Sequence, residues 1–125
     1  MSKISYTVYI VDDEQTIREG VTMALEDLYR IKDFADAESA IAALEKEPPD
    51  LVLLDVGLPG MDGIEALQRI LDMDNTIPVI LNTAYSSYRE NYLTWSADAY
   101  ITKSSDTTEL LVKVKELLDA KLVEN

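Results

Sequence analysis

Acidic residues stand directly after two apolar runs of this chain. Asp12 and Asp13 follow the run that ends at Val11, and Asp55 follows four consecutive aliphatic residues at 51–54. Where three carboxylates crowd together they repel one another, and a partly buried carboxylate is costly unless it is paired. A bound cation relieves both costs. Ligands that are all oxygen select a hard ion, and we expect Mg²⁺ rather than Ca²⁺. A carboxylate beside Mg²⁺ can itself accept a phosphoryl group.

Two further polar residues stand at the ends of later apolar runs. Thr83 follows the fourth run, and Lys103 follows the last. A single amine can neutralise only one of three acids, so the case for a cation remains. Taken one at a time, these residues also have ordinary explanations: solvated strand ends or turn caps for the acids, a helix cap for Thr83, a surface position for Lys103. The chemical interpretation therefore depends on their meeting at one place.

The composition excludes several kinds of chemistry. The chain has neither cysteine nor histidine, which rules out disulfides, thiolate metal sites and Ser-His or Cys-His nucleophile pairs. A net charge of −13 argues against binding nucleic acid or an anionic membrane through this domain. No apolar stretch is long enough to cross a bilayer, and the N-terminus is a poor secretory signal. Together with the lack of cysteine, this favours a cytoplasmic location.

Strand-like and helix-like segments alternate along the 125 residues, a length that suits one domain over 1–125. Apolar runs rich in β-forming residues predict strands at 6–11, 30–35, 51–55, 77–82 and 99–102. Apolar residues at helical spacing predict helices at 14–29, 36–47, 62–71, 85–95 and 106–122. Asp36 is a candidate helix cap, and Asp62 with Glu65 resembles a capping box.

Five such β–α units predict parallel strands joined by crossover helices. Nearly continuous aliphatic strands indicate a sheet that is covered on both faces. We therefore predict an α/β fold: a doubly wound, flavodoxin-like three-layer sandwich with five helices and a five-stranded parallel sheet in the order 2-1-3-4-5. In that order the first and third strands are neighbours, which would bring Asp12, Asp13 and Asp55 within a few ångströms of each other.

Over essentially its whole length the chain resembles the receiver domain of two-component response regulators. The resemblance depends on the Asp12-Asp13 pair, on LLDVGLPGMDG at 53–63, on Thr83, and on DAYITK at 98–103. It implies that the partner is a sensor histidine kinase or a phosphotransfer protein, whose phosphohistidine supplies a phosphoryl group. The resemblance further implies a downstream protein target or an output domain.

The resemblance also assigns a role to each residue of the acidic group. Asp55 would be the phosphoacceptor. Asp12, Asp13, Asp55 and the backbone carbonyl of Gly57 would hold Mg²⁺. Lys103 would bind a phosphoryl oxygen.

A second group would carry the switch and its readout. Thr83 would move to bind another phosphoryl oxygen, and the ring of Tyr100 would then turn inward, although simple packing also explains a tyrosine in a strand. In this family the fourth predicted helix, the last strand and the last helix commonly form the signalling face. The fourth predicted helix carries Tyr88, Tyr92 and Trp95, which either face the core or form a partner surface.

The sequence departs from the common family pattern at two positions. Ser104 follows Lys103 where many receivers have proline after a cis bond. A cis bond before serine would cost about 3–4 kcal/mol, so this bond is either trans or strained. Gly57, two residues after the acceptor, has no side chain to orient a hydrolytic water, and the bulky Tyr85 could shield the phosphoryl group. We expect the domain alone to lose the group slowly.

The predicted function is a switch in which phosphorylation of Asp55 shifts an inactive/active equilibrium. The domain would catalyse only its own phosphorylation and dephosphorylation. No output domain is expected within 1–125, and dimerisation on activation stays open. Two other interpretations stay open as well. One is a receiver-like adaptor that acts without phosphorylation. The other is a small Mg²⁺-dependent phosphohydrolase with an aspartate nucleophile, which usually has a second acid where this chain has Gly57.

Overall fold

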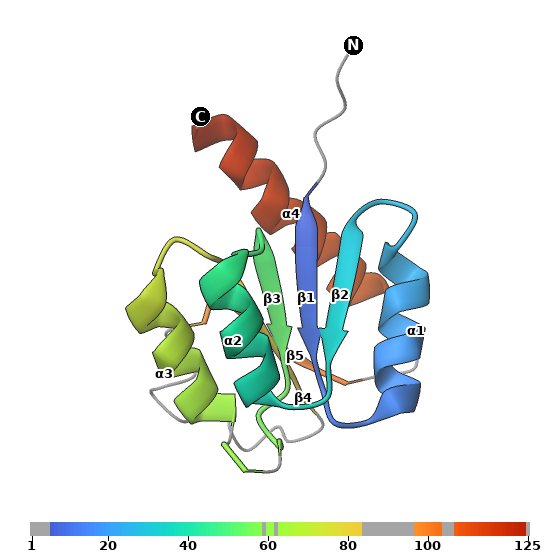
Figure 1. The fold of residues 1–125 in the computed structure, drawn as a ribbon. Helices are drawn as coiled ribbons and strands as arrows, with labels where there is room; N and C mark the ends of the chain where they lie inside the picture. The colour runs from blue at the N-terminus through green and yellow to red at the C-terminus, as the bar shows by residue number, and fades with distance from the viewer. Residues whose placement is uncertain (1–5, 59, 62, 84–96, 104–106, 125) are drawn as a thin grey trace.

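A parallel five-stranded sheet forms the centre of the computed structural model, which describes residues 6–58, 60–61, 63–83, 97–103 and 107–124. The strand order is β2-β1-β3-β4-β5, as predicted, and every neighbouring pair is parallel (Figure 1). The strands are β1 (Thr7–Val11), β2 (Arg30–Phe34), β3 (Leu51–Leu54), β4 (Val79–Thr83) and β5 (Ala99–Thr102).

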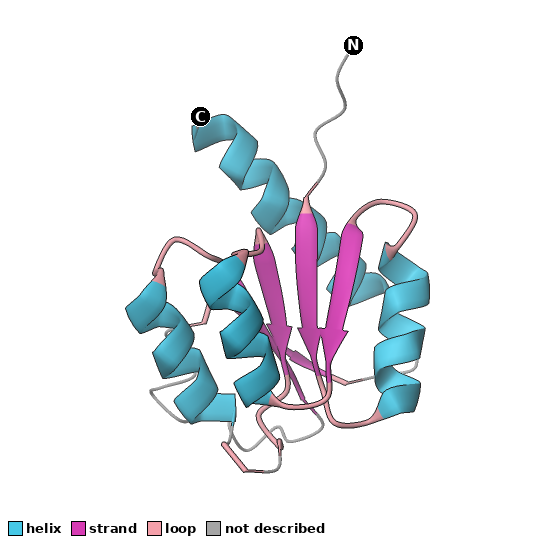
Figure 2. Ribbon diagram, in the orientation of Figure 1, coloured by secondary structure: helices cyan, strands magenta, loops and turns pink. Residues whose placement is uncertain are grey.

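Helices cover both faces of this sheet, which gives the predicted three layers (Figure 2). They are α1 (Gln15–Leu25), α2 (Ala37–Lys46), α3 (Gly63–Met73) and α4 (Thr108–Glu124). α2 and α3 lie on one face, and α1 and α4 lie on the other. The described part of the chain thus contains four helices, and the fourth of the five predicted helices, at 85–95, lies outside it.

Alternate residues of the central strands belong to two separate cores, because successive side chains point to opposite faces of a sheet. Tyr9, Val52 and Leu81 pack on the side of α2 and α3. Ile10 and Ile80 pack on the side of α1 and α4. All of these side chains are buried, so the sheet that carries the acidic residues is packed on both faces.

α1 is shorter than the first predicted helix, which extended to Tyr29. It ends at Leu25, whose carbonyl accepts hydrogen bonds from the N–H groups of Leu28 and Tyr29 at 3.0 Å. This turn brings Arg30 to the start of β2, opposite Thr7. Leu28 fits the helical spacing but lies after the helix with 65% of its surface exposed. The predicted end was wrong because the turn into the next strand prevails over continued apolar spacing.

β4 lies further along the chain than the predicted strand at 77–82. Pro78 has no N–H to donate to the ladder, so the strand begins after it, although its carbonyl accepts from Val52 N–H at 3.0 Å. Thr83 is consequently the last residue of β4 rather than the first residue after it. The other predicted ends agree within one or two residues where the structure describes them.

The predicted cap of α2 is present. Asp36 is the N-cap, and its Oδ1 accepts a hydrogen bond from the backbone N–H of Ser39 at 2.7 Å. The predicted cap of α3, Asp62, lies outside the described residues. Within the described part of the chain, every helix is too short or too polar to cross a membrane.

Candidate functional site

The carboxyl ends of β1 and β3 bring Asp12 and Asp55 together. Val11 and Leu54 are partners in the parallel register, and each aspartate follows one of them. The N–H of Asp55 donates to the carbonyl of Val11 at 3.0 Å, which locks the two strand ends together. Buried strands on both sides therefore hold these carboxylates on a rigid support.

Asp13 completes an acidic cluster with these two residues. One carboxylate oxygen from each of Asp12, Asp13 and Asp55 lies within 4.8 Å of the others, in agreement with the proximity expected from the strand order. Asp12 and Asp55 are buried, and Asp13 is exposed. This set of ligands suits Mg²⁺, which prefers oxygen and usually keeps several waters, for which the exposed side at Asp13 leaves room.

Lys103, directly after β5, supplies a positive charge to the cluster. Its Nζ lies 2.7 Å from Asp12 Oδ2, 3.1 Å from Asp55 Oδ2 and 3.5 Å from Glu14 Oε1. Burial lowers the pKa of Lys103, but the hydrogen bond to Asp12 and the charges of Asp55 and Asp12 outweigh it and raise the pKa above its ordinary value. Lys103 is therefore protonated at neutral pH, and one ammonium faces two buried carboxylates.

These contacts offset only part of the cost of burying the negative charge of Asp12. Burial raises the pKa of Asp12, and the negative charge of Asp55 adds to this effect. Hydrogen bonds from Lys103 and from the backbone N–H of Glu14, at 2.9 Å, act in the opposite direction but do not cancel it. The protein's own groups thus leave negative charge at this edge of the sheet that a divalent cation would stabilise.

Comparison of the sequence with models of known protein families identifies the family of this chain. The sequence model of the response regulator receiver domain matches residues 8–115, which include all three aspartates and Lys103. This chain belongs to the response regulator receiver domain family.

Solved receiver domains share the fold over almost the whole chain. The response regulator TrrA of Thermotoga maritima, in complex with Mg²⁺ and beryllofluoride, is 38% identical with a TM-score of 0.86, over 90% of this chain and 98% of its own. TrrA has also been solved in complex with the histidine kinase ThkA. A CheY-like receiver domain from Methanospirillum hungatei is 32% identical with a TM-score of 0.91, over 98% of this chain and 100% of its own.

Curated relatives are longer than this receiver domain. The probable transcriptional regulatory protein TcrX of Mycobacterium tuberculosis is 37% identical over 115 residues, which are 90% of this chain and 49% of TcrX. The phosphate regulon regulator PhoB of Pseudomonas aeruginosa is 38% identical over 120 residues, 92% of this chain and 52% of PhoB. The chain thus spans about half the length of the curated relatives it matches.

The loop after Asp55 approaches α3 without room for a side chain. Gly57 N–H donates to Asp55 Oδ1 at 3.1 Å, so the loop also orients the carboxylate. Gly63, the first residue of α3, donates its N–H to the carbonyl of Val56 at 3.0 Å. A Cβ at Gly63 would overlap Val56 Cα and lie 2.5 Å from the Asp55 carbonyl oxygen. Only glycine allows this approach directly behind the receiver's candidate phosphoacceptor.

The two candidate switch residues lie on neighbouring strands. Thr83 is fully buried at the end of β4, and its carbonyl accepts a hydrogen bond from Lys103 N–H at 2.7 Å. Tyr100, on β5, is paired with Leu81 and packs, partly buried, against the core on the side of α2 and α3. The backbone of β4 therefore connects Thr83 directly to the lysine of the receiver site.

The remaining predicted residues lie outside the described part of the structure. They are Tyr85, Tyr88, Tyr92, Trp95 and Ser104. The predicted partner surface and the geometry of the Lys103–Ser104 bond therefore stay predictions.

Two contacts at the receiver site were missed by sequence reasoning. Glu14 lies next to Lys103, and Arg18 of α1 donates from Nη1 to the backbone carbonyl of Asp12 at 2.7 Å. The sequence offered one signal for Arg18: it is a basic residue in the first turns of the helix that follows the acidic loop. That signal is weak, because surface helices commonly carry such residues.

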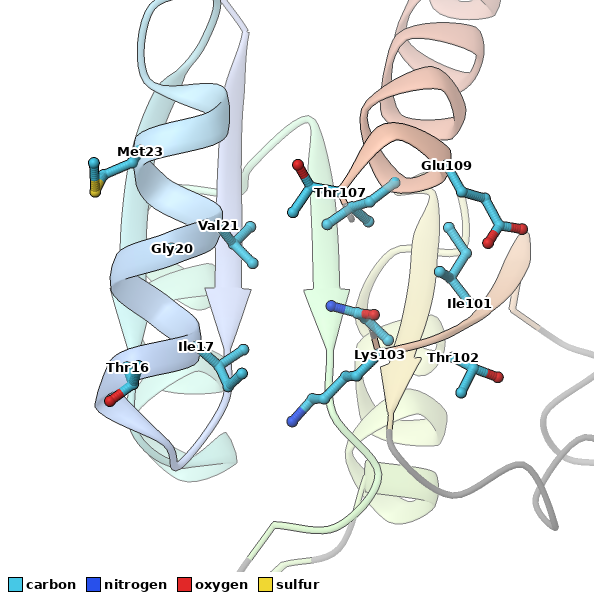
Figure 3. Close-up of a pocket in the computed structure, with 12 residues that line it drawn as sticks. Thr16, Ile17, Gly20, Val21, Met23, Ile101, Thr102, Lys103, Thr107 and Glu109 are labelled. Atoms are coloured by element: carbon cyan, nitrogen blue, oxygen red, sulfur yellow. The ribbon is translucent and has the colours of Figure 1, made fainter. Parts of the chain in front are cut away.

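A pocket of about 400 Å³ lies beside the acidic cluster, between α1 and the start of α4 (Figure 3). Ile17 and Val21 point into it from α1. Lys103 lines this pocket and also contacts the acidic cluster. Gly20 opens onto it, because a Cβ there would meet no atom within 4 Å. A Cβ atom therefore has room at Gly20 but not at Gly63.

Proposed function

We propose that this receiver domain is a phosphorylation-dependent switch and that Asp55 accepts the phosphoryl group. The observation that carries the proposal is the meeting of Asp12, Asp13 and Asp55 within 4.8 Å, with Lys103 Nζ 3.1 Å from Asp55 Oδ2. In the reaction an oxygen of Asp55 attacks the phosphorus of a phosphodonor, a new O–P bond forms, and the bond from phosphorus to the donor's leaving group breaks.

Both oxygens of Asp55 are held before the reaction. Oδ1 accepts from Gly57 N–H, and Oδ2 is paired with Lys103. A fixed carboxylate removes the need to order the nucleophile as the donor arrives, which lowers the barrier. The ammonium of Lys103 would then turn from Asp55 to an oxygen of the transferred group. There it would stabilise the negative charge of the phosphoryl oxygens.

Mg²⁺ is the proposed cofactor. Asp12, Asp13, Asp55 and the backbone carbonyl of Gly57 would hold it. When bound, it would neutralise charge on the phosphoryl oxygens. The fit of three carboxylate oxygens to a hard cation supports this proposal, and so does the Mg²⁺-beryllofluoride complex of TrrA.

Thr83 and Tyr100 are the proposed switch. The hydroxyl of Thr83 would hydrogen-bond a phosphoryl oxygen, and the Tyr100 ring would then turn inward. Their neighbouring strands and the bond from Lys103 N–H to the Thr83 carbonyl support such a coupling. Phosphorylation would in this way favour the active state of a two-state equilibrium.

The partners follow from the same proposal. The phosphodonor would be a histidine kinase or phosphotransfer protein, as the complex of TrrA with ThkA supports. The signal would pass to a protein target or an output domain through a face formed by the fourth predicted helix, expected at 85–95, together with β5 and α4. Dimerisation through this face on activation is one form of that readout. We expect the domain to work in the cytoplasm, where the proposed donor and target would act.

Beryllofluoride separates this function from its alternatives. Adding it with Mg²⁺ to the wild-type chain should shift the amide resonances of residues near Asp55 and Thr83, because it imitates a phosphoryl group on aspartate. An adaptor that acts without phosphorylation would show no such Mg²⁺-dependent shifts. A phosphohydrolase would turn over phosphate esters steadily, whereas we expect no turnover of any ester by this domain.

A further inference from the structure

Arg18 brings a largely buried guanidinium to the edge of the acidic cluster. Only 15% of its side chain is exposed. Nη1 donates to the carbonyl of Asp12 at 2.7 Å, and Nε donates to Asp33 Oδ2 at 3.0 Å. A charge this buried is unfavourable unless it is well paired, and these two contacts provide the pairing. Arg18 thereby ties α1 to the ends of β1 and β2.

The contact with Arg18 completes the restraint of Asp12. The N–H of Asp12 donates to the carbonyl of Phe34 at 3.0 Å, so its main chain is held on both sides. Its side chain accepts from Glu14 N–H through Oδ1 and pairs with Lys103 through Oδ2. Four contacts therefore hold Asp12, and without Arg18 its backbone N–H and both carboxylate oxygens would still be held.

Asp13 is in the opposite situation. Its carboxylate is exposed, and among the residues that the structure describes it makes no hydrogen bond or ion pair. Its backbone is then what sets the direction of its Cα–Cβ bond, and so the range of positions that the carboxylate can reach. The carbonyl of Asp12 and the N–H of Asp13 belong to one planar peptide unit. By holding that carbonyl, Arg18 fixes the plane from which the Asp13 side chain departs.

We propose that Arg18 is a positioning residue of the magnesium site, and that it aims the Asp13 carboxylate at the ion by holding the carbonyl of Asp12. The inference rests on the proposed function, since it requires Mg²⁺ at Asp12, Asp13 and Asp55. Arginine suits the task because its rigid plane donates in two directions at once, here to a carbonyl and to Asp33.

The test compares two variants that each remove one positive charge near β2. Arg18→Gln removes the contact with Asp12. Lys32→Gln is the matched control, because Lys32 pairs at 3.3 Å with Glu47, away from the cluster. Mg²⁺ affinity is measured by following amide resonances during titration with MgCl₂. We expect Arg18→Gln to bind Mg²⁺ about tenfold more weakly than wild type, as for other groups that orient metal ligands. The control should stay within about twofold.

A second readout separates positioning from stability. Without Mg²⁺, Arg18→Gln should shift the amide nitrogen resonance of Asp13, whose peptide loses its hydrogen bond. Arg18→Lys keeps the charge but lacks the rigid two-way donor, so it should also weaken Mg²⁺ binding. This variant gives the same comparison if Arg18→Gln does not fold.

Equal Mg²⁺ affinities for Arg18→Gln and Lys32→Gln would overturn the inference, even if Arg18→Gln were less stable. Full Mg²⁺ affinity in Arg18→Lys would also overturn it, because charge alone would then suffice. A wild-type chain that fails to bind Mg²⁺ would contradict the proposed function itself. If wild type binds Mg²⁺ normally and Arg18→Gln binds it equally well, only the inference about Arg18 is wrong and the proposed function stands.

Discussion

Lys103 Nζ lies 3.1 Å from Oδ2 of Asp55, although 48 positions separate the two residues in the sequence. The contact exists because β5 and β3 end at the same edge of a parallel sheet, with β4 between them. Lys103 also pairs with Asp12, so a single ammonium serves two buried carboxylates. One ammonium does not neutralise the three carboxylates of the cluster, so the site keeps an excess of negative charge.

That excess predicts a conflict between stability and function at Asp12. Because burial raises the pKa of Asp12, its ionised form destabilises the metal-free fold. Asp12→Asn should therefore be more stable than wild type to urea in EDTA at pH 7, while losing the stabilisation that Mg²⁺ gives to wild type. A less stable Asn variant in EDTA would contradict this account.

The same effect has a defined pH dependence. The pKa of Asp12 is higher in the folded than in the unfolded chain, so wild type without metal gains stability as the pH falls through the folded value. Asp12→Asn lacks this gain, and the difference between the two should shrink in acid. Asp13→Asn is the control, because it removes an exposed carboxylate. It should lose Mg²⁺ binding, but its stability to urea in EDTA should change less than that of Asp12→Asn.

Gly20 and Gly63 form a matched pair of helical glycines with opposite expectations. Gly20→Ala adds a methyl group in open space and should raise the free energy of unfolding by about 0.5–1 kcal/mol. Gly63→Ala would overlap the backbone of Val56, so it should destabilise the fold by several kcal/mol, on the order of other overpacked sites, or displace the loop after Asp55. Urea unfolding of both variants checks this, and equal effects would refute it.

Asp36 should stabilise α2 through its cap. Asp36→Ala is expected to lower the free energy of unfolding by about 0.5–2 kcal/mol at pH 7, whereas Asp36→Asn keeps the cap and should change it little. The hydrogen bond from Ser39 N–H lowers the pKa of Asp36 below its ordinary value of 3.8. The charged cap therefore contributes its full stabilisation above the pKa that Asp36 has in the unfolded chain. This stabilisation is lost as the pH falls through the lower pKa that Asp36 has in the folded chain. An Ala variant as stable as the Asn variant at pH 7 would contradict the role of the cap.

The phosphoryl group on Asp55 should be lost slowly. Gly57 is exposed and has no side chain to orient a water for hydrolysis. Gly57→Asn should therefore speed dephosphorylation in Mg²⁺ buffer, because its amide can orient the attacking water. The decay of phosphorylated protein, followed by mass spectrometry, measures both chains. Unchanged decay in the Asn variant would show that water placement at this position does not limit the rate.

The sheet and the acidic cluster were accessible from the sequence for one physical reason. Buried strands read as aliphatic runs, and residues that follow parallel strands must share one edge, so the meeting of Asp12 with Asp55 followed from the strand order. Lys103 was found in the same way, although its pairing with two carboxylates required the coordinates.

Other features depend on information that side-chain patterns lack. Arg18 acts on a main-chain carbonyl, and every residue has one, so no residue type marks the acceptor. The end of α1 was misplaced because Leu28 continues the helical spacing, while the start of β2 forces the chain to turn before it. The close approach behind Gly63 likewise depends on where the loop returns in space.

The most direct test of the central claim is the mass of the intact chain after treatment with acetyl phosphate, with Mg²⁺ or with EDTA. We predict that wild type gains about 80 Da, one phosphoryl group, with Mg²⁺ and nothing with EDTA. Asp55→Asn, which keeps the shape of the side chain, should gain nothing in either buffer. A wild-type chain that gains no mass with Mg²⁺, or an Asp55→Asn chain that gains as much as wild type, would contradict the account.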